Sequence, residues 1–98
     1  MPYAALLTDA ELADGLARLP DWHREDDTIQ RTVKLGGFMA AIAFVNAVAD
    51  AAEAANHHPD ITIHGYSRVT LTLTTHAAKG LTWRDLDLAG QIDALVPG

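Results

Sequence analysis

The chain has 98 residues, with 13 acidic and 7 basic side chains, a formal net charge of −6 and no cysteine. Without cysteine there is no disulfide framework, no thiol nucleophile and no metal site built on thiolate ligands. The acidic balance also argues against sequence-independent nucleic-acid binding, which depends on contacts from lysine and arginine to phosphates. We therefore expect one folded domain over residues 1–98, whose reactive groups are carboxylates, hydroxyls and five histidines.

The first predicted helix begins after Thr8. Glu11 follows three residues later, which is the spacing of a capping box, and a stripe of leucines continues until Pro20 ends the helix. The preceding segment, MPYAALLTDAE, has neither the basic region nor the full apolar region of a secretory signal peptide. We therefore expect a cytoplasmic protein. Residues 21–35 then predict a β-hairpin, because residues 25–27 are polar and residues 29–35 alternate between apolar and polar side chains.

A second helix is expected to begin at residues 36–37 and to end near Asn56 or His57, because Pro59 disfavours helical geometry in the residue before it. Its most apolar stretch, residues 36–49, is shorter than the roughly 20 residues of a membrane span, so we expect no membrane partner. Helical spacing predicts a buried face made of Phe38, Ile42, Val45, Ala49 and Ala52, broadened by Phe44, Val48 and Ala51.

Two further strands and a third helix complete the chain. Residues 61–64 and 66–75 alternate as strands, and the second of them has three threonines and His76 on its polar face. Thr82 and Asp85 have the spacing of another capping box. The order αββαββα, with tight turns and one apolar sheet face, predicts an α+β fold with an antiparallel sheet and the helices packed on one face.

The densest group of reactive side chains is Glu53, His57, His58 and Pro59. Glu53 and His57 are four residues apart, so we expect them to share a helix face, where the carboxylate would orient and charge the imidazole. Two adjacent histidines held by a proline turn could act as an acid and a base, or could clamp one flat ligand. Alternatively, the two histidines are only surface residues that cap the end of the helix and interact favourably with its dipole.

His76 is the second candidate, because it ends a polar strand face that would suit a polar heterocycle. It could equally be an exposed residue at the end of a strand. His23 and His64 lack neighbouring candidates and are expected on the surface. Trp22 is typical of a core residue, although it could also edge a pocket. A zinc or iron site is disfavoured, since the histidines lack the spacing of the common metal motifs.

The ordered combination of these residues resembles the pterin-4a-carbinolamine dehydratase family, from about Leu7 to Ile92. The resemblance is carried by Glu53-x-x-x-His57-His58-Pro59, then Tyr66, then Thr75-His76, then Gly80-Leu81-Thr82-x-x-Asp85. It implies four antiparallel strands with three helices on one face, and homodimers or homotetramers. It also implies a hydro-lyase that removes water from 4a-hydroxytetrahydrobiopterin to give quinonoid dihydropterin, without a metal or a cofactor.

The resemblance also implies roles for individual residues. His57, His58 and His76 are expected to be catalytic, with Glu53 and Asp85 in support. Trp22 and Thr75 are expected to bind the pterin substrate.

The chain departs from the family pattern at two places. Tyr66-Ser67-Arg68 replaces a run that often contains Asn-Lys, and Gly65 adds one residue to that turn. Ala77 replaces an acid, and Lys79 stands where glycine or alanine is common. Two other functions remain open. One is a protein-interaction module, since animal members of the family also serve as dimerisation cofactors of a homeodomain transcription factor. The other is a metal-dependent lyase or hydrolase that uses the same residues.

Overall fold

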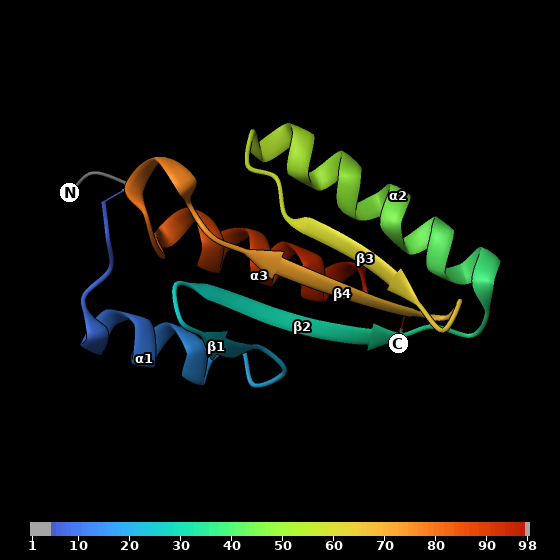
Figure 1. Ribbon diagram of the computed structural model, residues 1–98, viewed down its shortest axis with the longest axis horizontal. Helices are drawn as coiled ribbons and strands as arrows, with labels where there is room; N and C mark the ends of the chain where they lie inside the picture. Colours follow the sequence, from blue (N-terminus) through green and yellow to red (C-terminus); the bar gives the residue numbers. More distant parts are fainter. Residues whose placement is uncertain (1–4, 98) are drawn as a thin grey trace.

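The computed structural model describes residues 5–97, which form three α-helices, a short 3₁₀ helix and one four-stranded sheet (Figure 1). Residues 1–4 and residue 98 of the predicted domain lie outside the described residues. Residues 1–4 are the start of the N-terminal segment that was compared with a signal peptide. The predicted αββαββα order and α+β class are confirmed. The elements are α1 (Asp9–Ala17), β1 (His23–Glu25), β2 (Thr28–Lys34), α2 (Phe38–Ala55), β3 (Asp60–His64), β4 (Arg68–Leu73), η1 (His76–Ala78) and α3 (Trp83–Leu95).

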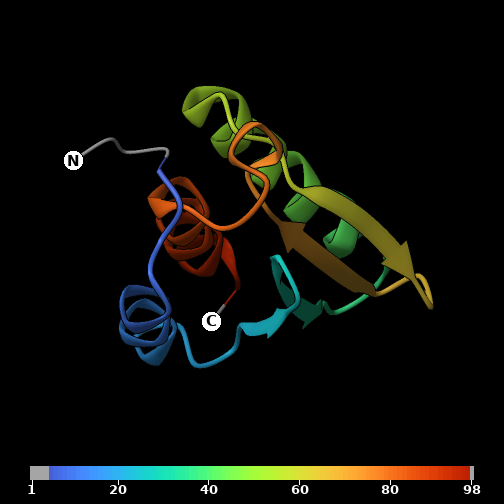
Figure 2. The same ribbon diagram turned by 60° about the vertical axis from the view of Figure 1, so that its left-hand side comes forward.

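The sheet is antiparallel, with strand order β1-β2-β4-β3, and the helices pack on one of its faces (Figure 2). Val69, Leu71 and Leu73 of the central strand β4 point to the helices and are fully buried. Thr70 lies on the opposite, open face, where its hydroxyl is 2.8 Å from that of Thr32 on β2. The predicted alternation along β4 is thus confirmed, although the strand starts at Arg68 because the turn before it uses left-handed backbone at residues 65–66.

Both predicted capping boxes are present. Thr8 accepts from the backbone N–H of Glu11, whose carboxylate accepts from the N–H of Thr8, and Thr82 and Asp85 form the second box. Each box satisfies backbone donors that the first turn of a helix leaves unpaired. The start of α3 is therefore fixed locally, and this start carries one wall of the site described below.

The buried face of α2 agrees with the predicted one at Phe44, Val48 and Ala52 and differs from it elsewhere. Ala41, Phe44, Val48 and Ala52 are buried, whereas Phe38 is 51% exposed and Ala49 is exposed. α2 carries apolar residues on most of its circumference, so helical spacing alone could not select the buried face.

The helix α2 has 18 residues. Within residues 5–97 it is the one helix that is long and apolar enough to span a bilayer, judged by length and composition alone. The length argument against a span therefore does not hold, although α2 packs against α3 and β4.

α2 ends as predicted at Asn56, which adopts a left-handed conformation with φ of 49°. The N–H of Asn56 donates to Glu53 O at 3.1 Å, and the N–H of His57 donates to Ala52 O at 3.1 Å. These two bonds form a Schellman motif, which satisfies carbonyls at the end of the helix. The chain direction after α2, and therefore the position of His57, depends on this one left-handed residue.

We expect Asn56→Ala to lower the free energy of unfolding by about 1 kcal/mol, because a Cβ without a polar group disfavours left-handed backbone. Asn56→Gly should unfold at the same urea concentration as the wild type or at a higher one, since glycine adopts this conformation freely. Urea unfolding followed by circular dichroism measures both. An alanine variant more stable than the glycine variant would contradict this account of the turn.

Candidate active site

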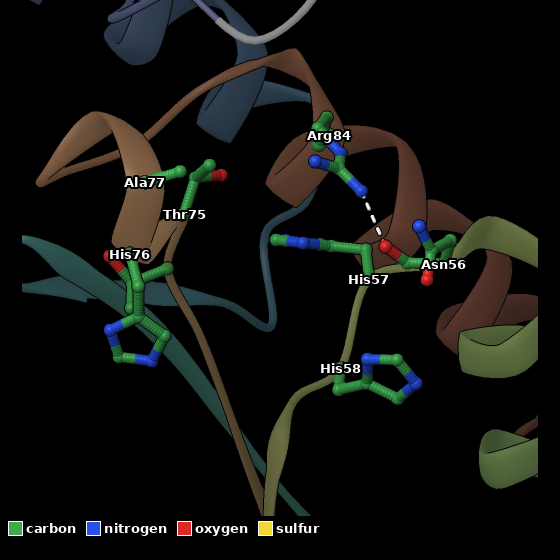
Figure 3. Close-up of a pocket in the computed structure, with 8 residues that line it drawn as sticks. Asn56, His57, His58, Thr75, His76, Ala77 and Arg84 are labelled. Carbon is green, nitrogen blue, oxygen red and sulfur yellow. Dashed lines mark hydrogen bonds between the residues drawn. The ribbon is translucent and has the colours of Figure 1, made fainter.

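An open pocket of about 220 Å³ lies where α2 ends, β4 ends and α3 begins (Figure 3). These three places are far apart in the sequence and are brought together by the packing of the helices on the sheet. The pocket contains all three histidines that the sequence indicated as catalytic. It is lined by Asn56, His57, His58, Thr74, Thr75, His76, Ala77 and Arg84.

His57 is held by a carboxylate from α3. Its Nε2 lies 2.6 Å from Oδ1 of Asp85, and both side chains are buried. Asp85 is the third residue of α3 and the acid of its capping box, so its position is set by the first turn of that helix. Asp85 therefore has two roles, because one oxygen caps the helix and the other holds the imidazole.

The second oxygen of Asp85 completes a buried network. Oδ2 accepts from the backbone N–H of Thr82 and from the hydroxyl of Thr75, each at 2.9 Å. The hydroxyls of Thr75 and Thr82 lie 2.8 Å apart. Burying a carboxylate is unfavourable unless its oxygens are hydrogen-bonded, and here both oxygens are. The network therefore fixes Asp85, and through it the ring of His57.

This network sets the tautomer of His57. A carboxylate can only accept hydrogen bonds, so Nε2 of His57 carries the proton that is shared with Asp85. In the neutral ring, Nδ1 then has a free lone pair, and within residues 5–97 no side chain or backbone group hydrogen-bonds to it. Nδ1 is thus the nitrogen that can accept a hydrogen bond or a proton from a molecule in the pocket.

Glu53 pairs with His58 and not with His57. Nε2 of His58 lies 2.5 Å from Oε2 of Glu53, and both side chains are largely exposed. The expected pair of Glu53 and His57 is therefore wrong. The spacing of four residues brings two side chains together only in a continuous helix, and the left-handed Asn56 ends the helix before His57. Asp85 takes the place that was predicted for Glu53.

His76 reaches the pocket from the 3₁₀ helix η1 and not from the strand face on which it was predicted. Figure 3 shows the rings of His76 and His58 on opposite sides of the opening, with His57 between them. The neighbouring Thr75 is 2% exposed and directs its hydroxyl to Asp85. Thr75 therefore supports the buried network, and its predicted contact with a substrate does not follow from its orientation.

Trp22 is a core residue and does not line the pocket. It is 4% exposed, and its Nε1–H donates to Oδ1 of Asp93 at 2.8 Å. Arg31 from β2 donates to the same oxygen, so the indole is held between β2 and α3. The predicted substrate contact of Trp22 is not supported, whereas its core alternative is confirmed. His23 and His64 are exposed, as predicted.

Sequence reasoning missed Arg84, which lies in the first turn of α3 and faces the pocket. Its Nη2 donates to the carbonyl oxygen of Asn56 at the end of α2 (Figure 3). A signal for it does exist in the sequence. A cation in the first turn of a helix is unfavourable because the N–H groups there carry partial positive charge, so an arginine at this place indicates an interaction outside the helix.

Comparison with known proteins identifies the family. Residues 5–95 match the model of the pterin 4 alpha carbinolamine dehydratase family. The chain belongs to this family. Among dehydratase relatives, a protein of Nocardia farcinica is 58% identical over 92% of this chain and 94% of its own length. A protein of Picosynechococcus is 51% identical over 94% of this chain and 99% of its own length. Both carry the name pterin-4-alpha-carbinolamine dehydratase as a provisional one.

Two solved structures of dehydratase-like proteins are similar. The transcriptional coactivator/pterin dehydratase from Brucella melitensis is 33% identical, with a TM-score of 0.87 over 93% of this chain and 98% of that one. A pterin dehydratase-like protein identified as a RuBisCO assembly factor in the alpha-carboxysome has a TM-score of 0.64 over 79% of this chain and 88% of its own. At 23% identity, the second shows only that the fold is shared.

The departures from the dehydratase pattern fall into two groups. Residues 66–68 lie at the far end of β4 and do not line the pocket, whereas Ala77 lies in it. The first departure is therefore remote from the three histidines. The second leaves a methyl group in the pocket, at the position where the family resemblance implied an acid.

We expect Asp85→Asn to keep the fold and to change the tautomer of His57. The amide oxygen can still accept from Thr82 and Thr75, while the amide nitrogen faces Nε2 and donates to it, so the ring proton moves to Nδ1. Imidazole nitrogen NMR measures this change. Glu53→Gln is the matched control and should leave His57 unaltered, because Glu53 pairs with His58. A His57 signal that responds to the control and not to Asp85→Asn would refute the pairing.

Proposed function

We propose that the protein is a hydro-lyase that dehydrates 4a-hydroxytetrahydrobiopterin to quinonoid dihydropterin, in the recycling of tetrahydrobiopterin in the cytoplasm. The observation that carries this proposal is the convergence of His57, His58 and His76 in one open pocket of about 220 Å³. Membership of the dehydratase family supports the choice of substrate.

The reaction needs one acid and one base. The bond between C4a and its hydroxyl oxygen breaks, the electron pair leaves with the oxygen, and a proton from the acid completes the water. A base removes a proton from a ring nitrogen, whose electron pair forms the new C=N bond. Imidazole suits both tasks because its proton affinity matches neutral pH.

The surroundings of the histidines divide these tasks. His57 presents a free Nδ1 and has the buried Asp85 behind it, which suits a group that takes up a proton in the transition state. His76 is exposed at the opposite side of the pocket, where it can deliver a proton to the leaving hydroxyl. His58, paired with Glu53, can bind the substrate or act as the acid for the other 4a face.

A protein-interaction role is the alternative. The Brucella melitensis protein is named as a coactivator as well as a dehydratase, and the carboxysome protein as an assembly factor. We favour catalysis because an adaptor would not require three histidines and a buried carboxylate around one pocket. Homodimers or homotetramers are proposed as well, supported by the sheet edge that β3 leaves unpaired within the described residues and by the exposed Phe38 and Met39 on α2.

We expect His57→Ala and His76→Ala each to slow dehydration of freshly generated carbinolamine by about 100-fold or more, the usual effect of losing an acid–base group. The matched control is His64→Ala, which removes an exposed histidine on β3 and should keep the wild-type rate. Wild-type rates in both site variants would refute the assignment. A wild-type protein that is inert toward carbinolamine but retains a protein partner in pull-down would favour the adaptor alternative.

The same assay tests for a metal. Within residues 5–97, no three histidine, aspartate or glutamate side chains converge as ligands, and two of the pocket imidazoles are paired with carboxylates. We therefore expect the wild-type rate to survive chelation, with metal analysis confirming removal. Activity that is lost on chelation and restored by zinc or iron would favour a metal-dependent enzyme.

A further inference from the structure

We propose that Arg84 binds the carbonyl oxygen at C4 of the pterin ring and so determines which heterocycles the pocket accepts. This inference rests on the proposed function. Arg84 reaches the pocket from the first turn of α3, next to Asp85 in the sequence. Its role would be to orient the substrate against the histidines, without taking part in proton transfer.

One nitrogen of the Arg84 guanidinium is hydrogen-bonded within the described part of the chain, and the other two are not. Nη2 donates to the carbonyl oxygen of Asn56, and within residues 5–97 the guanidinium forms no other hydrogen bond or ion pair. An arginine has five N–H donors in a planar fork. The remaining donors lie at a pocket that also contains three imidazoles, and an acceptor on the ligand can take the place of solvent at them.

The same anchor restrains the guanidinium. Arg84 and Asp85 are successive residues of α3, and they hold Asn56 and His57, which are successive residues at the end of α2. The cation and the imidazole are thus fixed relative to each other. Prior ordering of this kind lowers the entropic cost of binding a ligand in one orientation.

The C4 carbonyl is the acceptor that this geometry favours. It is bonded directly to C4a, the carbon that loses the hydroxyl, so a substrate whose reacting atoms lie between His57 and His76 also presents this oxygen to a neighbouring donor. A charged donor and a carbonyl form a stronger hydrogen bond than two neutral groups do. A 4-amino group at the same place would direct N–H donors at a cation and would be rejected.

The test compares two stable ligands, 7,8-dihydropterin and its 2,4-diamino analogue, by fluorescence titration. We expect the wild type to bind the 4-oxo compound at least about tenfold more tightly, the effect of one charged hydrogen bond. Arg84→Met should lose this preference, and Arg84→Lys should retain part of it, since lysine keeps the charge without the fork. Arg68→Met, which removes the same charge from the exposed start of β4, should behave as the wild type.

The ratio of the two affinities distinguishes binding from a structural role, because a displaced turn would weaken both ligands together. Imidazole nitrogen signals of His57 verify in each variant that the pair with Asp85 is intact. An absent preference in the wild type, or a preference that persists in Arg84→Met, would overturn the inference. A wild type that prefers the 4-oxo ligand but does not dehydrate carbinolamine would refute the proposed function and leave the role of Arg84 standing.

Discussion

The carboxylate of Asp85 is fully buried, and its two oxygens receive hydrogen bonds from three parts of the chain. One oxygen faces the imidazole of His57 after α2, and the other accepts from Thr75 after β4 and from the cap of α3. A buried carboxylate that lost one of these donors would be strongly destabilising, so the three parts are constrained to meet. The pocket exists at the point where they meet.

This constraint distinguishes the three histidines of the pocket. His57 is buried against a fixed carboxylate, whereas His58 and His76 are exposed to solvent. The rigid histidine and the two accessible ones have different surroundings although they are the same residue type. The proposed acid–base reaction would use this difference, since one group must take up a proton while another gives one.

Arg84 and Asp85 show how a helix start can organise a site. Both hold the end of α2, one through a backbone carbonyl and the other through an imidazole. The capping box makes the first turn of α3 rigid by local interactions, and the rigidity is transferred to residues almost thirty positions earlier in the chain. Mutations that weaken the box should therefore disturb the geometry of His57 as well as the stability of the helix.

The sequence by itself determined the order of the elements, both capping boxes, the end of α2 and the three histidines, because these depend on local spacing or on a motif. Only the tertiary structure decided which carboxylate serves which histidine, which face of α2 is buried, and that Trp22 belongs to the core. Asn56 turns the chain away from the helix path, so the spacing between Glu53 and His57 no longer measures their distance. The partner of His57 comes from 28 residues further along, and a contact over that separation is decided by packing.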